Sequence, residues 1–151
     1  MSAEPYFEAP VLAVDRVVRL RSDAYGKGYF GASRSGGRAH EGIDILSPVG
    51  TPVRASKSGR VSMSTSSKKG YGECIEIFHP DGLKTRYAHL LRREAVAGDW
   101  VLTGQVIGFC GKSGNAVNPH IKPHLHFEIR SSDRAMNPSA GFLDPSIRVI
   151  S

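Results

Sequence analysis

Residues 124–128 read His124-Leu125-His126-Phe127-Glu128. Successive side chains of a β-strand point to opposite faces, so His124, His126 and Glu128 would share one face while Leu125 and Phe127 enter the core. At a rise of about 3.3 Å per residue, the Cα atoms of the two histidines would lie roughly 7 Å apart. One imidazole could then bind a metal while the other faces a substrate. A polar sheet face with incidental histidines explains this segment alone equally well.

The chain around this segment is punctuated by turns containing glycine or proline, with short stretches rich in β-branched and aromatic residues between them. This pattern predicts an all-β fold, mainly antiparallel, with little helix. Only Leu90–Ala97 could form a helical turn or two. The expected strands are Thr51–Ala55, Arg60–Ser64, Glu73–Phe78, Lys84–His89, Gln105–Cys110 and Leu125–Arg130, with further candidates at Val11–Leu20 and Ile147–Ile150.

A second candidate segment is His40-Glu41-Gly42-Ile43-Asp44. A neutral imidazole and a carboxylate are ordinary zinc ligands. Along a flat strand, His40 and Asp44 would lie roughly 13 Å apart, too far to share one ion easily. Gly42 between them permits a bend or bulge that would bring the two side chains together. Glycine and the aspartate also distinguish this segment from a helical His-Glu-x-x-His metalloprotease motif.

The third element is Tyr87-Ala88-His89, at the end of a predicted strand. Together the three segments supply three zinc ligands and two additional histidines, and catalytic zinc commonly uses three protein ligands plus a water. Two neutral histidines and one carboxylate would leave the site with a net charge of about +1, which keeps the ion a strong Lewis acid.

Composition limits the other functions. The 151 residues suit a single domain that needs no disulfides, with 40% hydrophobic and 23% charged residues and a net charge of +6. The basic residues are scattered and do not alternate with aromatics, so we expect no nucleic-acid partner. No apolar run is long enough for a transmembrane segment, and the first residues lack the pattern of a secretory signal.

The ordered motifs resemble the lysostaphin-type peptidoglycan metalloendopeptidases. The resemblance covers about residues 36 to 130 and is carried by Gly37-Arg38-Ala39-His40-Glu41-Gly42-Ile43-Asp44-Ile45, Gly50-Thr51-Pro52-Val53, Tyr71-Gly72, Thr85-x-Tyr87-Ala88-His89-Leu90, Gly98-x-x-Val101-x-x-Gly104-Gln105-x-Ile107-Gly108 and His124-Leu125-His126-Phe127-Glu128-Ile129.

The resemblance implies that His40, Asp44 and His126 bind one zinc ion, and that His89 and His124 are catalytic histidines beside it. Which of the two is the general base stays open. It also implies an open substrate groove in the sheet, a peptidoglycan peptide as substrate and an extracytoplasmic location. We expect a monomer with an N-terminal arm, residues 1–35, packed on a zinc metallopeptidase domain, residues 36–151.

Two other functions fit the same scaffold: a non-catalytic, zinc-containing module that binds or regulates at the cell wall, and a zinc amidase acting on the same substrate. All five histidine and aspartate positions are present, which favours an enzyme that hydrolyses peptide bonds in cross-links or stem peptides.

Several other residues receive no chemical role from the sequence. Cys74 and Cys110 lie in apolar stretches and are expected to be core thiols, although spacing does not exclude a disulfide. His79 begins a predicted hairpin turn. Residues 115–123 form a long loop in which His120 could touch substrate, although a solvated loop is favoured. Gly111-Lys112-Ser113 is not a P-loop, since Val106 stands where glycine would be required.

Overall fold

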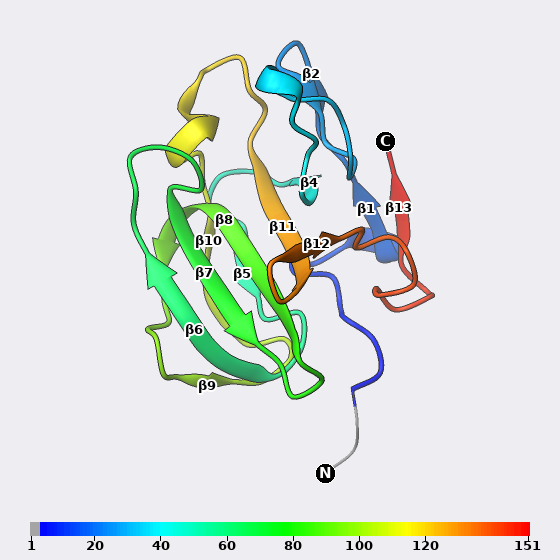
Figure 1. The fold of residues 1–151 in the computed structure, drawn as a ribbon, viewed down its shortest axis with the longest axis vertical. Helices are drawn as coiled ribbons and strands as arrows, with labels where there is room; N and C mark the ends of the chain where they lie inside the picture. Colours follow the sequence, from blue (N-terminus) through cyan, green and yellow to red (C-terminus); the bar gives the residue numbers. More distant parts are fainter. Residues whose placement is uncertain (1–3) are drawn as a thin grey trace.

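The computed structural model describes residues 4–151, and within them one nine-stranded sheet forms the framework (Figure 1). Its strands pair antiparallel throughout, in the order β12-β11-β8-β7-β6-β9, while β4 pairs with β11 and β10 pairs with both β5 and β8. The bounds are β4 Ile43–Leu46, β5 Pro52–Arg54, β6 Gly59–Thr65, β7 Glu73–Phe78, β8 Leu83–Arg93, β9 Trp100–Val101, β10 Val106–Cys110, β11 His124–Ser131 and β12 Arg134–Met136.

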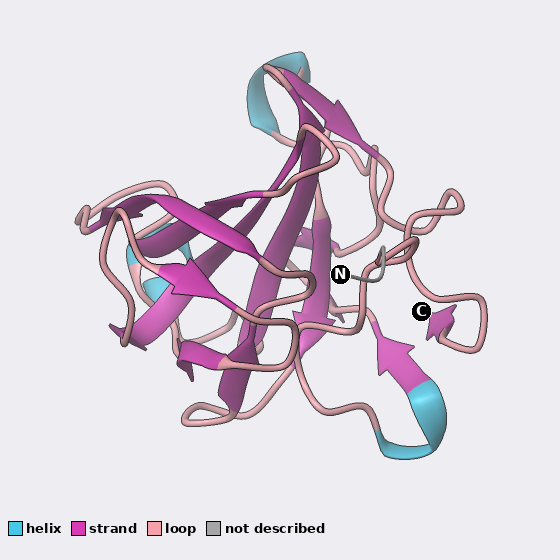
Figure 2. Cartoon of the chain, turned by 90° about the horizontal axis from the view of Figure 1, so that it is seen from below, coloured by secondary structure: helices cyan, strands magenta, loops and turns pink. Residues whose placement is uncertain are grey.

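Two small sheets lie beside this framework. Strand β1 (Val17–Arg19) pairs in parallel with β13 (Arg148–Ile150), and β2 (Ser22–Asp23) forms a hairpin with β3 (Gly26–Lys27). Helical structure among residues 4–151 is confined to three short 3₁₀ turns, η1 (Val14–Arg16), η2 (Ser35–Gly37) and η3 (Gly114–Val117), as Figure 2 shows. The predicted all-β, mainly antiparallel fold is confirmed. None of the helices in the described part is long and apolar enough to span a bilayer.

All six central strand predictions are confirmed, but the helical turn expected within Leu90–Ala97 is wrong. Strand β8 continues through this region to Arg93. Leu90 is fully buried and pairs with Glu73 on one side and Cys110 on the other, so both neighbouring strands hold it extended. The pairing partners are distant in sequence, which local propensity does not register.

The two terminal strand candidates have different outcomes. Ile147–Ile150 is confirmed as β13, which begins at Arg148. Only the last part of Val11–Leu20 is a strand, since residues 14–16 form the η1 turn, in which Asp15 and Arg16 have φ values of 56° and 59°.

Strand β11 has the predicted alternation. Leu125, Phe127 and Ile129 are fully buried and pack with Tyr87 and the isoleucines of β7. On the other face, His124, His126 and Glu128 are also buried. The chain therefore covers the polar face of this strand as well as the apolar one, and every polar atom on it needs a partner.

His79 and the two cysteines are buried outside the site. His79 lies in the β7–β8 turn, where its Nδ1 contacts Ser58 O at 2.9 Å and its Nε2 contacts Thr85 Oγ1 at 2.8 Å. Cys74 and Cys110 are both free and buried, which confirms two core thiols, and burial raises the pKa of Cys110 to about 11.

Candidate metal centre and active site

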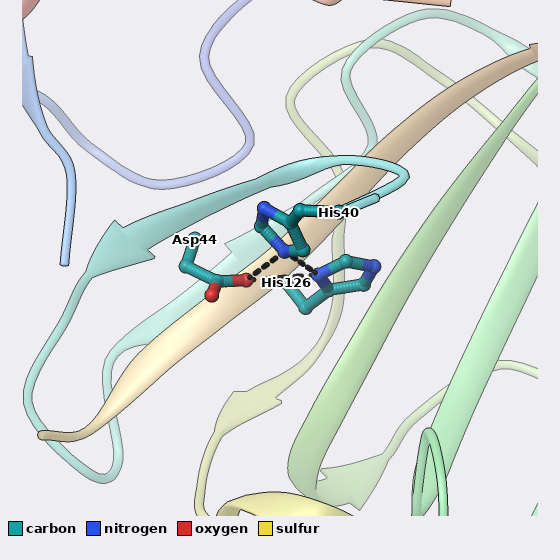
Figure 3. A group of neighbouring side chains, drawn as sticks. All are labelled: His40, Asp44 and His126. Carbon is teal, nitrogen blue, oxygen red and sulfur yellow. Dashed lines mark hydrogen bonds and ion pairs between the residues drawn. The ribbon is translucent and has the colours of Figure 1, made fainter. Parts of the chain in front are cut away.

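Three of the predicted residues converge from two adjacent strands. Asp44 on β4 stands opposite His126 on β11, and His40 lies just before β4. His40 Nε2 is 3.1 Å from both Asp44 Oδ1 and His126 Nδ1, and the latter two atoms are 2.8 Å apart (Figure 3). Zinc ligands 2.0–2.2 Å from an ion in tetrahedral geometry would stand about 3.3 Å from one another. The spacing fits one zinc ion.

The outer nitrogens of both rings determine which atoms face inward. His40 Nδ1 lies 2.9 Å from the carbonyl of Tyr29, and His126 Nε2 lies 2.7 Å from Oε2 of Glu128. Carbonyl and carboxylate oxygens only accept hydrogen bonds, so each of these nitrogens carries the proton. His40 Nε2 and His126 Nδ1 therefore direct lone pairs toward Asp44 Oδ1. Three acceptors in contact with one another form a site for a cation.

The electrostatics favour positive charge at the same point. A proton can occupy this point in place of a cation. Burial raises the pKa of the Asp44 carboxyl, but hydrogen bonds from protonated His126 and His40 would outweigh this effect and hold the pKa well below its usual range. Burial opposes protonation of His126, yet its bonds to Asp44 and Glu128 raise its pKa to about 9. The pKa of Glu128 is lowered to about 2 despite burial, chiefly by His126. The two carboxylates remain ionised at neutral pH.

Gly42 lies at the expected bend just before β4, without a bulge, and it also allows close packing. Pairing between β4 and β11 is regular from Ile43 to Leu46, and the φ of Gly42 is not positive. A Cβ atom at this position would lie 2.4 Å from the carbonyl oxygen of Phe127. Only glycine allows this segment to lie directly against β11, and this contact brings His40 next to His126.

His89 and His124 stand beside the three converging side chains. Their ring centroids are 5.2 Å apart, and the His89 ring lies 5.9 Å from that of His126. Each Nδ1 lies 2.8 Å from a backbone carbonyl, that of Ser113 for His89 and that of Lys122 for His124. Both rings thus hold their proton on Nδ1 and have a lone pair on Nε2.

Both of these histidines are held neutral. Burial and the neighbouring histidines lower the pKa of His89 to about 3. Burial also lowers the pKa of His124, although nearby Asp44, 3.8 Å from its Nε2, acts in the opposite direction. A neutral imidazole with a free Nε2 lone pair can accept a proton at neutral pH.

His89 has a backbone conformation that is uncommon for a non-glycine residue. Its φ is 61°, in the left-handed region. The β7–β8 register shifts between Glu73 and Ile75, opposite this position, and the His89 N–H donates to Tyr71 O at 2.8 Å. His89 is thus part of a bulge within β8 rather than its end, and bulges of this kind re-aim a side chain.

The long loop before His124 is fastened to the domain. Lys112 Nζ donates to the carbonyls of Asn118 and Ile121 at 2.9 and 2.6 Å. His120 is exposed, and its ring stacks on Tyr25 with centroids 6.4 Å apart. Instead of the helix that a P-loop requires, the four-residue η3 turn follows Ser113.

Sequence reasoning missed the residues that hold these side chains. Arg21 Nε lies 3.1 Å from Asp44 Oδ2, and an Arg34 nitrogen lies 3.5 Å from the same oxygen. The Tyr71 hydroxyl donates to Glu128 Oε2 at 2.7 Å. No local spacing links Arg21 to Asp44 or Tyr71 to Glu128, because these pairs meet only through folding.

The family profile of Peptidase family M23 matches residues 38–138. Among curated proteins, the chain is 43% identical over 101 residues to the DD-carboxypeptidase/endopeptidase Mpg of Neisseria meningitidis, which covers 67% of this chain and 22% of Mpg. It is 37% identical over 101 residues to the peptidoglycan DD-endopeptidase ShyC of Vibrio cholerae, covering 67% and 22% respectively. The chain thus spans about a fifth of the length of these relatives.

A solved structure shares the fold. The catalytic domain of the antimicrobial peptidase lysostaphin from Staphylococcus simulans superposes with a TM-score of 0.63 at 33% identity, over 78% of this chain and 89% of that one. The family match covers well over half of the sequence and includes all five histidine and aspartate residues of the site. The chain therefore belongs to Peptidase family M23.

Proposed function

We propose that this protein is a zinc-dependent endopeptidase that hydrolyses peptide bonds in bacterial peptidoglycan, in cross-links or in stem peptides. The observation that carries the proposal is the convergence of three lone-pair donors, from His40, Asp44 and His126, beside two further histidines that are neutral. Family M23 membership and relatives named as endopeptidases support the same activity.

His40, Asp44 and His126 would hold the ion, which when bound supplies a Lewis acid that polarises a peptide carbonyl and acidifies water. The Nε2 atoms of His89 and His124 then stand next to the reacting groups. One of them accepts the proton of the attacking water and delivers it to the leaving amine. The other, a neutral ring with a lone pair on Nε2, accepts a hydrogen bond from the attacking water and positions it. The geometry suits both assignments of these two roles.

The relatives support a peptidoglycan substrate. ShyC is named as a peptidoglycan DD-endopeptidase, and it is similar to this chain over 101 residues. Such a substrate lies outside the cytoplasm, so we place the protein in the periplasm, in the cell wall or outside the cell, acting as a monomer. The peptide would lie over the face of β8 and β11 that carries His89, His124 and His126.

Zymography against purified peptidoglycan tests the proposal directly. The zinc-loaded chain should clear the substrate, a chelator should abolish clearing, and added zinc should restore it. His126→Ala serves as the inactive control. Mass spectrometry of fragments from a defined muropeptide then identifies the bond, separating cleavage within the peptide from cleavage of the sugar-linked amide. Zinc binding with no hydrolysis of any peptidoglycan tested would contradict the proposal and favour a wall-binding module.

A further inference from the structure

The arm that precedes the family-matched segment contacts the site directly. Arg21 is buried, with 6% of its surface exposed. Its backbone N–H donates to the Asp44 carbonyl at 2.8 Å, and its Nε donates to Asp44 Oδ2 at 3.1 Å. Asp44 Oδ1 faces His40 and His126. Each carboxylate oxygen thus has its own set of partners, which fixes the rotation of the carboxylate and leaves one oxygen free for a metal.

The same guanidinium extends the contact to a second residue. Arg21 also donates to Asp23 Oδ1 at 2.7 Å, and the other oxygen of Asp23 accepts the backbone N–H of Lys122 at 3.1 Å. The carbonyl of Lys122 accepts the Nδ1 proton of His124 at 2.8 Å. A continuous chain of hydrogen bonds therefore joins the candidate ligand Asp44 to the candidate catalytic histidine His124.

The residues that directly follow the β2–β3 hairpin also contact the site. The Gly28 carbonyl accepts the Asp44 N–H at 2.9 Å, and the Tyr29 carbonyl accepts the His40 ring proton. A Cβ atom on Gly28 would lie 2.9 Å from the Arg21 backbone and 3.0 Å from Asp44 Cβ. Figure 1 shows the β2 hairpin near the start of β11, the strand whose first residue is His124.

We infer that Arg21 and Asp23 are positioning residues, through which the N-terminal arm holds Asp44 and His124 in one geometry. The inference rests on the proposed function for its chemistry, and both residues lie outside residues 38–138. The guanidinium is suited to this task because its planar fork donates to two carboxylates at fixed angles. Arg34 is a second cation near Asp44, but it donates to the Lys27 carbonyl rather than to Asp23.

Three variants separate the two contacts. Arg21→Gln removes the fork and its charge. Arg21→Lys keeps a positive charge near Asp44, but its single ammonium group cannot donate to the carboxylates of both Asp44 and Asp23 in the geometry of the guanidinium. Asp23→Asn leaves one oxygen, which can keep the hydrogen bonds from Arg21 and Tyr25, so the bond from the Lys122 N–H is lost. Arg19→Gln is the matched control, because Arg19 is an exposed β1 residue that makes no side-chain hydrogen bond or ion pair within residues 4–151.

The measurements are zinc affinity by chelator competition, the visible absorption spectrum of the cobalt-substituted protein, and kcat and KM on a muropeptide. We expect Arg21→Gln to weaken zinc binding about 10- to 100-fold and to change the cobalt spectrum, as loss of a ligand's outer partner does. Arg21→Lys should recover part of that affinity. Asp23→Asn should bind zinc within a few-fold of wild type but lower kcat about tenfold at unchanged KM, as expected for one lost hydrogen bond near His124.

The outcomes distinguish this inference from the proposed function. Zinc affinity and cobalt spectra equal to those of the Arg19→Gln control in both Arg21 variants would overturn the inference and leave the hydrolase intact. An inactive wild-type chain whose zinc affinity still falls in Arg21→Gln would support the inference while the proposed activity fails. If Arg21→Gln does not fold, Arg21→Lys and Asp23→Asn still decide the question. A wild-type chain that bound no zinc would overturn both.

Discussion

Oε2 of Glu128 lies 2.7 Å from Nε2 of His126, and this contact determines which ring nitrogen of His126 is free to bind a metal. The two residues are on the same face of β11, two positions apart. Glu128 is itself held by the Tyr71 hydroxyl at 2.7 Å and by Arg130 at 2.8 Å. A carboxylate with such partners orients the histidine and increases its basicity as a ligand.

Glu128→Gln should weaken zinc binding by about tenfold or more, because the charge that orients His126 is lost while the side-chain size is kept. Chelator competition measures the change. Glu41→Gln is the control. Glu41 is exposed, and its Oε2 lies 3.5 Å from a guanidinium nitrogen of Arg130. Equal zinc affinity in the two variants would show that Glu128 does not orient the ligand.

His126→Ala should lose zinc itself, whereas His89→Ala and His124→Ala should retain it and lose most of their turnover. The reason is that, of these three histidines, only His126 contributes a nitrogen to the cluster of converging lone pairs. Elemental analysis after dialysis, together with muropeptide hydrolysis, checks both statements. Full activity in either His89→Ala or His124→Ala would contradict the assignment of catalytic roles.

Gly42→Ala should destabilise the fold and impair zinc binding, because the new methyl group would lie 2.4 Å from the Phe127 carbonyl oxygen. We expect a loss of about 1–3 kcal/mol or more from overpacking, read from chemical denaturation. Gly50→Ala is the matched control. Its φ of 93° disfavours alanine, but a Cβ there meets no atom within 4 Å. The expected cost of that change is about 1 kcal/mol. A smaller effect at Gly42 than at Gly50 would exclude the packing explanation.

His79→Gln should make the stability of the fold less dependent on pH. Burial lowers the pKa of His79 below 6.5, so the unfolded chain takes up a proton at a higher pH than the folded chain does. The contribution of neutral His79 to stability is therefore fully present above pH 6.5 and is lost as the pH drops from 6.5 toward the folded pKa.

Thermal unfolding of the zinc-free protein at pH values from about 7.5 to about 5 measures this dependence, because this range extends to both sides of the usual histidine pKa of about 6.5. His120→Gln, the same substitution at an exposed position, serves as the control. Identical slopes in His79→Gln and the wild type would mean that the buried His79 does not contribute.

The sequence alone predicted most of the framework and the candidate reactive groups. Alternation along residues 124–128 placed two histidines and a carboxylate on one face of a strand, since a strand repeats every two residues. Turn signals also separated the other five central strands, whereas β4, β9 and β12 of the same sheet were not predicted. The helical turn expected within Leu90–Ala97 was wrong because the neighbours that hold this segment extended, β7 and β10, are brought there only by the sheet.

Tertiary structure decided how the reactive groups are oriented. His40 and Asp44 reach one point because Gly42 lies against the Phe127 carbonyl, a contact that joins segments more than eighty residues apart. Likewise, the carbonyls and carboxylates that set the ring protons of the histidines, and the Arg21 contact on Asp44, come from distant parts of the chain. Residue type and local periodicity follow from sequence, whereas a hydrogen-bond partner is defined only when separate segments pack together.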